Sequence, residues 1–259
     1  GAADVLWEVT AGTNEADRLE GVDAVVHLAG AGIGDKKWTP ERKQVVLTSR
    51  TRGTGLLART LAGLSAKPRV LVSGSAIGYY GNRGDEVLTE DSGPGHDFLA
   101  EVVQAWEAAA EPARDAGIRV VEIRSGIVLA AHGGVLQRLL LPFKLGLGGR
   151  VGSGSQYMSW ITLDDEVAAI AHVLANDAVH GPVNLTAPNP ATNADFSKAL
   201  GRELHRPTLL PTPLAPLKVL YGSELVKSLL VDGQRVSSAK LVASGYRFAH
   251  PELPDALHA

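Results

Sequence analysis

The chain has 259 residues, enough for one large domain, or for one domain and a small lobe, with a sizeable buried core. Its formal net charge of −3 comes from interspersed acidic and basic residues, which excludes the basic surface that attracts nucleic acids and anionic membranes. It has no cysteine, which excludes disulfide bonds, thiolate metal sites and a cysteine nucleophile.

The pattern of apolar residues along the chain alternates between strands and helices. The strands are expected at residues 4–9 (Asp4–Val9), 23–28, 69–73, 118–124 and 183–185. The helices are expected at residues 38–61 (one helix or a pair), 98–116, 136–143, 164–176, 193–204, 214–222, 223–230, 238–244 and 253–258. For the helices at 164–176 and 193–204, the expected N-terminal caps are Leu163–Asp165 and Asn193.

Strands separated by helices predict an α/β fold with a doubly wound parallel sheet, Rossmann-like, and the proline-dense end of the chain predicts a small C-terminal lobe. Ligands of such a sheet bind at the carboxyl ends of its strands. Three strands of this chain end in small or polar residues, at Gly30, Ser75 and Gly126. We therefore expect these three ends to share one crevice.

Six motifs carry a resemblance to a known family. They are His27–Gly30, Ser73–Gly81, Trp106–Ala109, Arg124–Leu129, Leu141–Gly149 and Ser159–Ile161. Together they resemble the atypical extended short-chain dehydrogenase/reductases called nucleoside-diphosphate-sugar epimerase family proteins, which have a small C-terminal domain. The resemblance covers essentially the whole chain.

The resemblance implies a dinucleotide-binding domain at residues 1–155 and a substrate-side lobe at residues 156–259, with some chain crossing back to the first domain. It also implies NADP, or NAD, as the cofactor. In this family a Gly-rich turn after the first strand receives the cofactor pyrophosphate. No such turn precedes the strand at 23–28, so we expect the first βαβ unit, roughly 40 residues, to lie outside this sequence.

The family assigns cofactor contacts to the strand ends. By resemblance, Leu28, Ala29 and Gly30 line the dinucleotide, and Arg50 supports it from the following helix. Further predicted contacts are Ser73 and Gly74 in the second strand and Arg124, Ser125 and Gly126 at the end of the third. From the residues alone, Arg50 could instead make a solvated salt bridge, and Arg124 could pair with an acidic partner in the sheet. His27 is expected to be a satisfied core histidine.

Catalysis in the family uses a serine or threonine beside the nicotinamide and a Tyr-x-x-x-Lys pair on the next helix. Ser75 occupies the serine position, but Phe98 and Val102 stand where the tyrosine and lysine are expected, and neither can transfer a proton. We predict Ser75 and Tyr79 as catalytic residues. The alternatives are a turn-capping serine and a packing tyrosine.

Other groups near the entrance of that helix could replace the missing pair. These are Tyr80, His96, Asp97 and Glu101, of which His96 and Asp97 could instead cap the helix and Glu101 could be a solvated side chain. The Gly-rich segment 146–154, with Lys144 and Arg150, predicts either a mobile lid for an anionic substrate or a loop whose charges face water.

The residues therefore predict an NAD(P)-dependent oxidoreductase or epimerase-like enzyme acting on an unidentified small molecule. The alternative is a non-catalytic NADP-binding regulatory or interaction protein. No metal-ligand spacing occurs among the eight histidines. No apolar run approaches the roughly 20 residues of a membrane helix, and the composition is typical of a bacterial gene. We expect a cytoplasmic protein without nucleic-acid or membrane partners, for which a homodimer is a further expectation.

Overall fold

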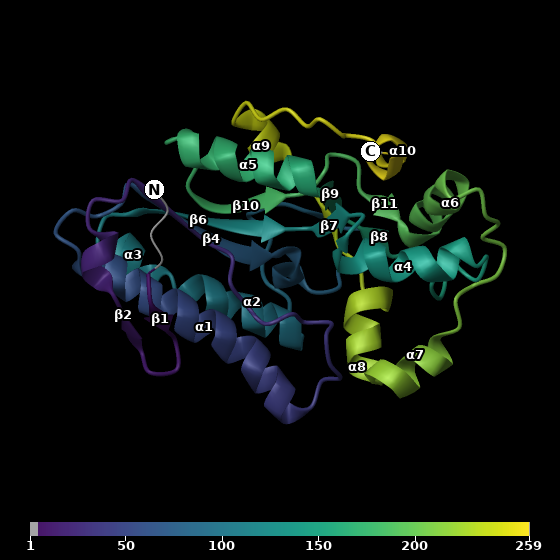
Figure 1. Cartoon of the computed structure of the whole chain (residues 1–259). Helices are drawn as coiled ribbons and strands as arrows, with labels where there is room; N and C mark the ends of the chain where they lie inside the picture. The colour runs from purple at the N-terminus through teal and green to yellow at the C-terminus, as the bar shows by residue number, and fades with distance from the viewer. Residues whose placement is uncertain (1–4, 259) are drawn as a thin grey trace.

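The computed structural model describes residues 5–258, and its centre is a parallel β-sheet covered by helices on both faces (Figure 1). Four strands form this sheet in the order β10-β6-β4-β3, and every neighbouring pair is parallel. The strands are β3 (Ala24–His27), β4 (Val70–Ala76), β6 (Arg119–Ser125) and β10 (Gly181–Leu185). The predicted doubly wound α/β fold is confirmed.

Along each buried strand, successive side chains point alternately to the two faces of the sheet. One face is covered by α1 (Pro40–Gly63), α2 (Phe98–Ala108) and α3 (Glu111–Asp115), and the other by α5 (Leu163–Ala175) and α9 (Ala239–Ala243) (Figure 1). Leu71 and Val120 pack in the core on the side of α1 and α3, whereas Val70, Val72 and Val121 pack with residues of α5 and α9. Among the residues described, no helix is both long and apolar enough to cross a membrane.

The N-terminal part forms a separate hairpin of β1 (Trp7–Glu8) and β2 (Thr13–Asn14), followed by the 3₁₀ turn η1 (Ala16–Leu19). The strand predicted at Asp4–Val9 is therefore shorter and lies outside the central sheet, and Asp4 itself lies outside the described residues. Its tryptophan, Trp7, packs against the core beneath α1. Among residues 5–258, β3 therefore lies at the edge of the sheet and pairs only with β4.

The helix predicted at 98–116 is divided. Residues Ala109 and Ala110 separate α2 from α3, and Pro112 follows at the start of α3. Proline has no N–H to donate to the carbonyl four residues earlier, and its ring clashes there, so one continuous helix cannot pass this point.

Two predicted helix caps are wrong by one to three residues. The hydroxyl of Thr162 accepts the hydrogen bond from the N–H of Asp165 at the start of α5, and Thr192 does the same for Asp195 in α6 (Asn193–Glu203). Each threonine precedes its helix in extended backbone, which leaves its hydroxyl free to reach the first turn. Asn193 instead accepts a hydrogen bond from the N–H of Val151 and so fastens a loop.

The remaining elements lie mostly beyond the carboxyl ends of the sheet (Figure 1). They form the strand pairs β7 (Ile127–Ala130) with β9 (Trp160–Thr162), β8 (Tyr157–Met158) with β11 (Ala191–Thr192), and β5 (Val87–Leu88) with β12 (Arg235–Val236). The other helical elements are η2 (Ile77–Tyr80), α4 (Gly134–Lys144), α7 (Leu214–Tyr221), α8 (Ser223–Val226), the π-helical turn η3 (Lys227–Val231) and α10 (Leu253–His258). The helix predicted at 223–230 is thus α8 and η3. Trp160 and Phe196 lie in a third apolar core between these elements.

One carboxylate, that of Asp165, fastens the C-terminal segment to the start of α5. Its Oδ1 accepts hydrogen bonds from the Tyr246 hydroxyl at 2.9 Å and the Ala249 N–H at 2.8 Å, and its Oδ2 accepts from the His250 N–H at 3.0 Å and the Thr162 hydroxyl at 3.1 Å. Asp165 is 1% exposed, so none of these bonds has water as an easy substitute.

We expect Asp165→Asn to lower the free energy of unfolding by about 2 kcal/mol. The NH2 group of asparagine cannot accept hydrogen bonds, so the buried donors that face it lose their partner. Asp164 lies beside it in the same turn but is exposed, so Asp164→Asn makes the same charge change and is expected to cost less than about 0.5 kcal/mol. Urea unfolding of the two variants measures the difference, and equal losses would contradict the assignment.

Candidate functional site at the carboxyl ends of the strands

The strand register places the three predicted strand ends at one edge of the sheet. His27 pairs with Ser73, Ser75 with Arg124, and Ala76 with Ser125. Because the strands are parallel, the loops that contain Gly30, Ile77 and Gly126 all leave the sheet at the same edge. The three strand ends therefore share one edge, as predicted, although the side chains of Ser75 and Ser125 point to opposite faces.

The loop after β3 is exposed at Leu28, Ala29 and Gly30 and is supported from α1. Arg50 donates from Nη1 to the carbonyl of Ala31 at 2.9 Å, and a Cβ on Gly30 would lie 3.1 Å from its guanidinium carbon. Burial, with a smaller contribution from the charge of Arg42, lowers the pKa of Arg50. Arg50 makes no ion pair in the part of the chain that the structure describes, so the alternative of a surface salt bridge is wrong. Arg50 supports the loop, and its support of the dinucleotide stays a prediction.

Gly74 and its neighbours form a tightly packed wall beneath this loop. A Cβ on Gly74 would lie 2.8 Å from Cζ2 of Trp106, whose indole N–H donates to the Thr54 hydroxyl at 2.9 Å. The Arg50 guanidinium carbon lies 5.0 Å from the Trp106 ring centroid. Only glycine permits this approach of α2 to β4.

Two residues of this region are less accessible than a ligand contact requires. Ser73 is fully buried, and its hydroxyl donates only to the Gly74 carbonyl, at 3.3 Å. His27 lies in the core, 5.1 Å from Trp7 between ring centroids, and burial lowers its pKa. The core interpretation of His27 is confirmed, but it is not satisfied, because its Nε2 has no hydrogen-bond partner among residues 5–258.

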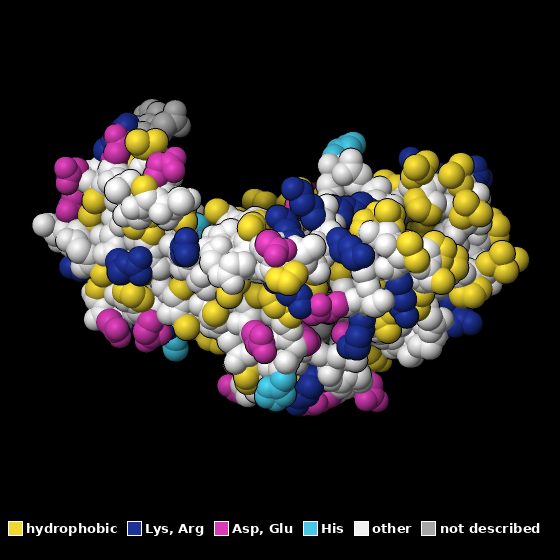
Figure 2. All heavy atoms as spheres, turned by 90° about the horizontal axis from the view of Figure 1, so that it is seen from below, with side chains coloured by type: hydrophobic (Ala, Val, Ile, Leu, Met, Phe, Trp, Pro, Cys, Tyr) yellow, Lys and Arg dark blue, Asp and Glu magenta, His cyan; other side chains and the backbone are white. Residues whose placement is uncertain are grey.

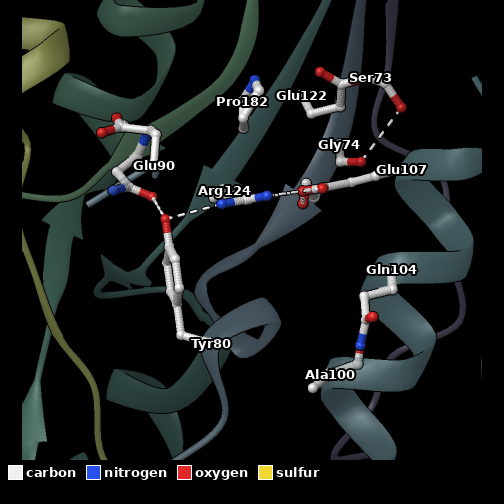
Figure 3. A network of polar contacts seen from close by, with 12 residues as sticks. Ser73, Gly74, Tyr80, Glu90, Ala100, Gln104, Glu107, Glu122, Arg124 and Pro182 are labelled. Atoms are coloured by element: carbon white, nitrogen blue, oxygen red, sulfur yellow. Dashed lines mark hydrogen bonds and ion pairs between the residues drawn. The ribbon is translucent and has the colours of Figure 1, made fainter. Parts of the chain in front are cut away.

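A buried ion pair between Arg124 of β6 and Glu107 of α2 organises the α2 side of the site (Figure 3). Arg124 donates from Nε and Nη2 to the two oxygens of Glu107, at 2.8 and 2.9 Å. Ser75 Oγ donates to the same carboxylate at 2.6 Å. The Tyr80 hydroxyl accepts from Arg124 at 3.1 Å and donates to Asn184 at 2.7 Å.

The charges of this group compensate one another. Burial disfavours the Arg124 cation, but the hydrogen bonds and charge of Glu107 outweigh burial and raise the pKa of Arg124. Burial likewise raises the pKa of Tyr80, so its phenol remains protonated. Arg124 has an acidic partner, as the alternative interpretation held, but the partner belongs to α2 and not to the sheet.

The Ser75 hydroxyl points into this network and caps no turn, so that alternative is wrong. The hydroxyl proton of Ser75 points to Glu107, which leaves the lone pairs of its oxygen available to a further donor. Glu107, Tyr80 and Asn184 are partners of Ser75 and Arg124 that the sequence did not predict. Glu107 and Arg124 both lie in motifs that carry the resemblance, and because a buried arginine in a strand requires a carboxylate, their pairing could have been predicted.

Tyr79 lies on the same side as Arg124. Its ring centroid is 3.5 Å from the Arg124 guanidinium carbon, in cation–π contact. Tyr79 also lines a cleft of about 310 Å³ between α2, α3 and the sheet, together with Glu107 and Glu122. Burial raises the pKa of Glu122, which contacts Arg114.

The positions of the missing tyrosine and lysine are packed with apolar groups. Phe98 lies edge-on to Trp38 at 5.0 Å and under the ammonium of Lys43 at 4.8 Å, and Val102 is buried. Asp97 caps α2 by accepting from the Ala100 N–H at 2.9 Å, as the alternative interpretation predicted. Glu101 is exposed.

On the opposite face, Ser125 donates to Glu166 of α5 at 2.5 Å. Burial raises the pKa of Glu166 to about 7, and its second oxygen has no partner among the described residues.

A Cβ on Gly126 would lie 2.5 Å from the Ser159 carbonyl, so glycine is required where β6 leads into β7. No group of three potential metal ligands occurs in the part of the chain described.

One of the two cations of the Gly-rich loop, Arg150, bonds to the backbone of the loop itself. Arg150 donates to the carbonyls of Gly152 and Ser153 at 2.8 and 2.9 Å, whereas Lys144 is exposed at the end of α4. Arg150 thus stabilises the fold of its own loop.

The pKa of Glu166 predicts a pH-dependent stability. Between about pH 4.5 and 7 the unfolded chain loses this proton before the folded chain does, so rising pH favours unfolding, and the full effect is present above pH 7. We expect Glu166→Gln to match the wild type at about pH 4 and to be more stable by about 1–3 kcal/mol at about pH 8. Urea unfolding at both pH values tests this, with the exposed Glu101→Gln as the control; a stability difference that does not change with pH would contradict it.

Solved structures share this fold. A human epimerase family protein, SDR39U1, crystallised with NADPH, is 36% identical with a TM-score of 0.88, over 94% of this chain and 84% of that one. A nucleoside-diphosphate sugar epimerase from Corynebacterium glutamicum is 34% identical with a TM-score of 0.77, over 97% of this chain and 48% of that one. A Bacillus cereus UDP-glucuronic acid 4-epimerase solved with NAD, at 16% identity and a TM-score of 0.75 over 98% of this chain and 77% of that one, shares the fold alone.

Curated relatives and family models agree with these structures. The epimerase family protein ML0860 of Mycobacterium leprae is 40% identical over 99% of this chain and 82% of its own length, and YfhF of Bacillus subtilis is 35% identical over 98% and 82%. Residues 212–259 match a domain of unknown function, DUF1731, and residues 9–185 match the NAD dependent epimerase/dehydratase family. With more than half of its length matched, this chain belongs to the NAD-dependent epimerase/dehydratase family.

Proposed function

We propose that the protein binds NADP(H), or alternatively NAD(H), and is an oxidoreductase or epimerase-like enzyme acting on a small molecule. The observation that carries the proposal is the arrival of the Gly30, Ser75 and Gly126 segments at one edge of the sheet. The human relative solved with NADPH supports NADP over NAD.

The residues at this edge fit a dinucleotide. Leu28, Ala29 and Gly30 are exposed, and the last two of them are small. Small residues let a flat ring and a ribose approach the backbone. Gly126 and Ser125 lie at the end of β6, where the nicotinamide half would bind. When bound, the cofactor supplies a hydride donor or acceptor.

The protein's own contribution is to hold a substrate oxygen and to move its proton. Ser75 already donates to Glu107, so its oxygen accepts a hydrogen bond from a substrate hydroxyl. The proton can then pass through Ser75 to the Glu107 carboxylate, which Arg124 holds in place at 2.8 Å. Ser75 and Glu107 would thus transfer the proton in place of the family's tyrosine and lysine, whose positions are occupied here by Phe98 and Val102. Tyr79, against Arg124, is the second predicted catalytic residue.

The second candidate is a non-catalytic NADP-binding protein that regulates or binds a partner. The packing of Phe98 against Trp38 favours it, because the helix position of the usual proton donor is filled by apolar contacts.

We further propose a bacterial, cytoplasmic atypical short-chain dehydrogenase/reductase with a small-molecule partner, no nucleic-acid or membrane partner, and a homodimeric state. The absence of cysteine and the interspersed charges support this proposal. The division into 1–155 and 156–259 also remains a proposal.

Full-length protein is expected to bind NADPH with a dissociation constant below about 1 mM, a binding free energy stronger than about −4 kcal/mol. Gly30→Val should weaken binding at least about tenfold, because the side chain would occupy the cofactor edge and press on Arg50. Gly93→Val is the control, since no atom lies within 4 Å of its Cβ position. Fluorescence titration measures both, and no binding by wild type at about 1 mM would overturn the proposal.

In a screen of alcohols and carbonyl compounds that follows cofactor absorbance, Ser75→Ala is expected to lower turnover by about 10²–10⁴-fold. Ser73→Ala removes a neighbouring hydroxyl that contacts only its own strand, and should change turnover less than about threefold. Both variants should bind NADPH as the wild type does. Tight binding without turnover in the wild type would favour the regulatory candidate instead.

A further inference from the structure

A cavity of about 290 Å³ lies beyond the carboxyl ends of the strands, enclosed by α4, α6, α7, α8 and η3. Its volume is at the lower end of the range for small-molecule sites, about 300–1,000 Å³. Since a water molecule takes roughly 30 Å³, the cavity has room for about ten non-hydrogen atoms.

The walls of this cavity are mainly apolar. Leucine, valine, phenylalanine and proline side chains come from every enclosing element, among them Val135, Phe143, Phe196, Leu217 and Leu229. Such walls favour a ligand that buries hydrocarbon or ring surface, because the affinity comes from removing that surface from water.

The polar groups of the wall are few, and most are already engaged. Arg138 is its one charged side chain, and it donates to the Gly34 carbonyl at 2.7 Å and to Asp35 at 3.1 Å. Asn193 holds the Val151 N–H at 2.7 Å. The hydroxyls of Ser197 and Tyr221 have no hydrogen bond within residues 5–258, so they can orient one polar group of a ligand.

This lining does not suit a nucleoside diphosphate. The two phosphates of such a ligand require cations or a series of hydrogen-bond donors, and a charge left without them in an apolar wall is strongly disfavoured. Arg138 is the one cation of the wall, and Asp35 already neutralises it.

The cavity borders the proposed cofactor edge. Gly34, in its wall, follows Gly30 by four residues, so the two lie at most about 14 Å apart along the chain. Arg138 fixes Gly34 against α4. One loop therefore contributes both to the cofactor edge and to the cavity.

Apolar side chains are also exposed on and beside the elements that enclose the cavity. Leu209 and Leu210 are 89% and 77% exposed, and Leu145, Val219 and Leu220 are exposed as well. Figure 2 shows hydrophobic side chains gathered at one end of the molecule, with lysines and arginines between them. An apolar ligand therefore finds apolar surface outside the cavity wall as well as inside it.

We propose that this cavity takes the body of a small, predominantly apolar molecule with one hydrogen-bonding group, in contrast to the nucleotide sugars named for some proteins of this fold. That the molecule is the substrate rests on the proposed function, which places the reacting centre at Ser75.

The test uses 1-naphthylamine on the full-length protein, because this uncharged aromatic amine is about as large as the cavity and its fluorescence changes in apolar surroundings. We expect saturable binding of one probe per chain, displaced by 1-decanol and not by UDP-glucuronic acid at about 1 mM. Leu217→Trp, which fills the cavity from α7, should weaken probe binding at least about tenfold. Leu220→Trp places the same side chain on the exposed face of the same helix and should change it less than about twofold.

Val135→Trp fills the cavity from α4 and repeats the test if Leu217→Trp does not fold. Equal effects of the Leu217 and Leu220 variants, or displacement by UDP-glucuronic acid and not by 1-decanol, would overturn the inference. NADPH titration of the same samples separates the two proposals. Probe binding without NADPH binding overturns the proposed function alone, and NADPH binding without saturable probe binding overturns only the apolar cavity ligand.

Discussion

The ion pair of Arg124 and Glu107 is the interaction on which the site depends. It joins β6 to α2 and orients the side chains of Ser75 and Tyr80, which come from β4 and η2. A buried pair of charges is tolerated only when its hydrogen bonds are complete, and here Nε, Nη1 and Nη2 of Arg124 all donate. Loss of either partner would leave an unpaired charge and release Ser75, so structure and chemistry depend on the same bonds.

Glycines make this arrangement possible by letting elements approach closely. Trp106 can lie on β4 only because Gly74 has no side chain, and Gly126 allows the Ser159 carbonyl to approach β6. The first contact sets the position of α2, and hence of Glu107 one residue further along. The second sets where the chain leaves the sheet. The positions of the polar side chains at the edge therefore depend on the close packing at Gly74 and Gly126.

Two chemical environments meet beyond the sheet. The edge at Gly30, Ser75 and Gly126 has exposed backbone and a compensated polar network, whereas the cavity between α4 and α7 is apolar. The loop from Gly30 to Gly34 contributes to both, and Arg138 holds it. A reaction that transfers hydride needs such a division, because one half of the site must bind a charged dinucleotide and the other must exclude water from the reacting carbon.

The parallel sheet, its flanking helices and the shared edge of Gly30, Ser75 and Gly126 could be predicted from the residues alone, because residue periodicity and strand ends are local properties. The sequence also indicated what is missing, since Phe98 and Val102 cannot transfer protons. Three features became visible only in the folded chain: Ser75 faces Glu107, 32 residues away, Ser73 is buried, and α2 ends before Pro112. Contacts between distant segments depend on how helices pack on the sheet, and no local pattern encodes the direction in which a strand-end hydroxyl points. The same holds for the apolar cavity, whose walls come from five elements that meet only in the folded chain.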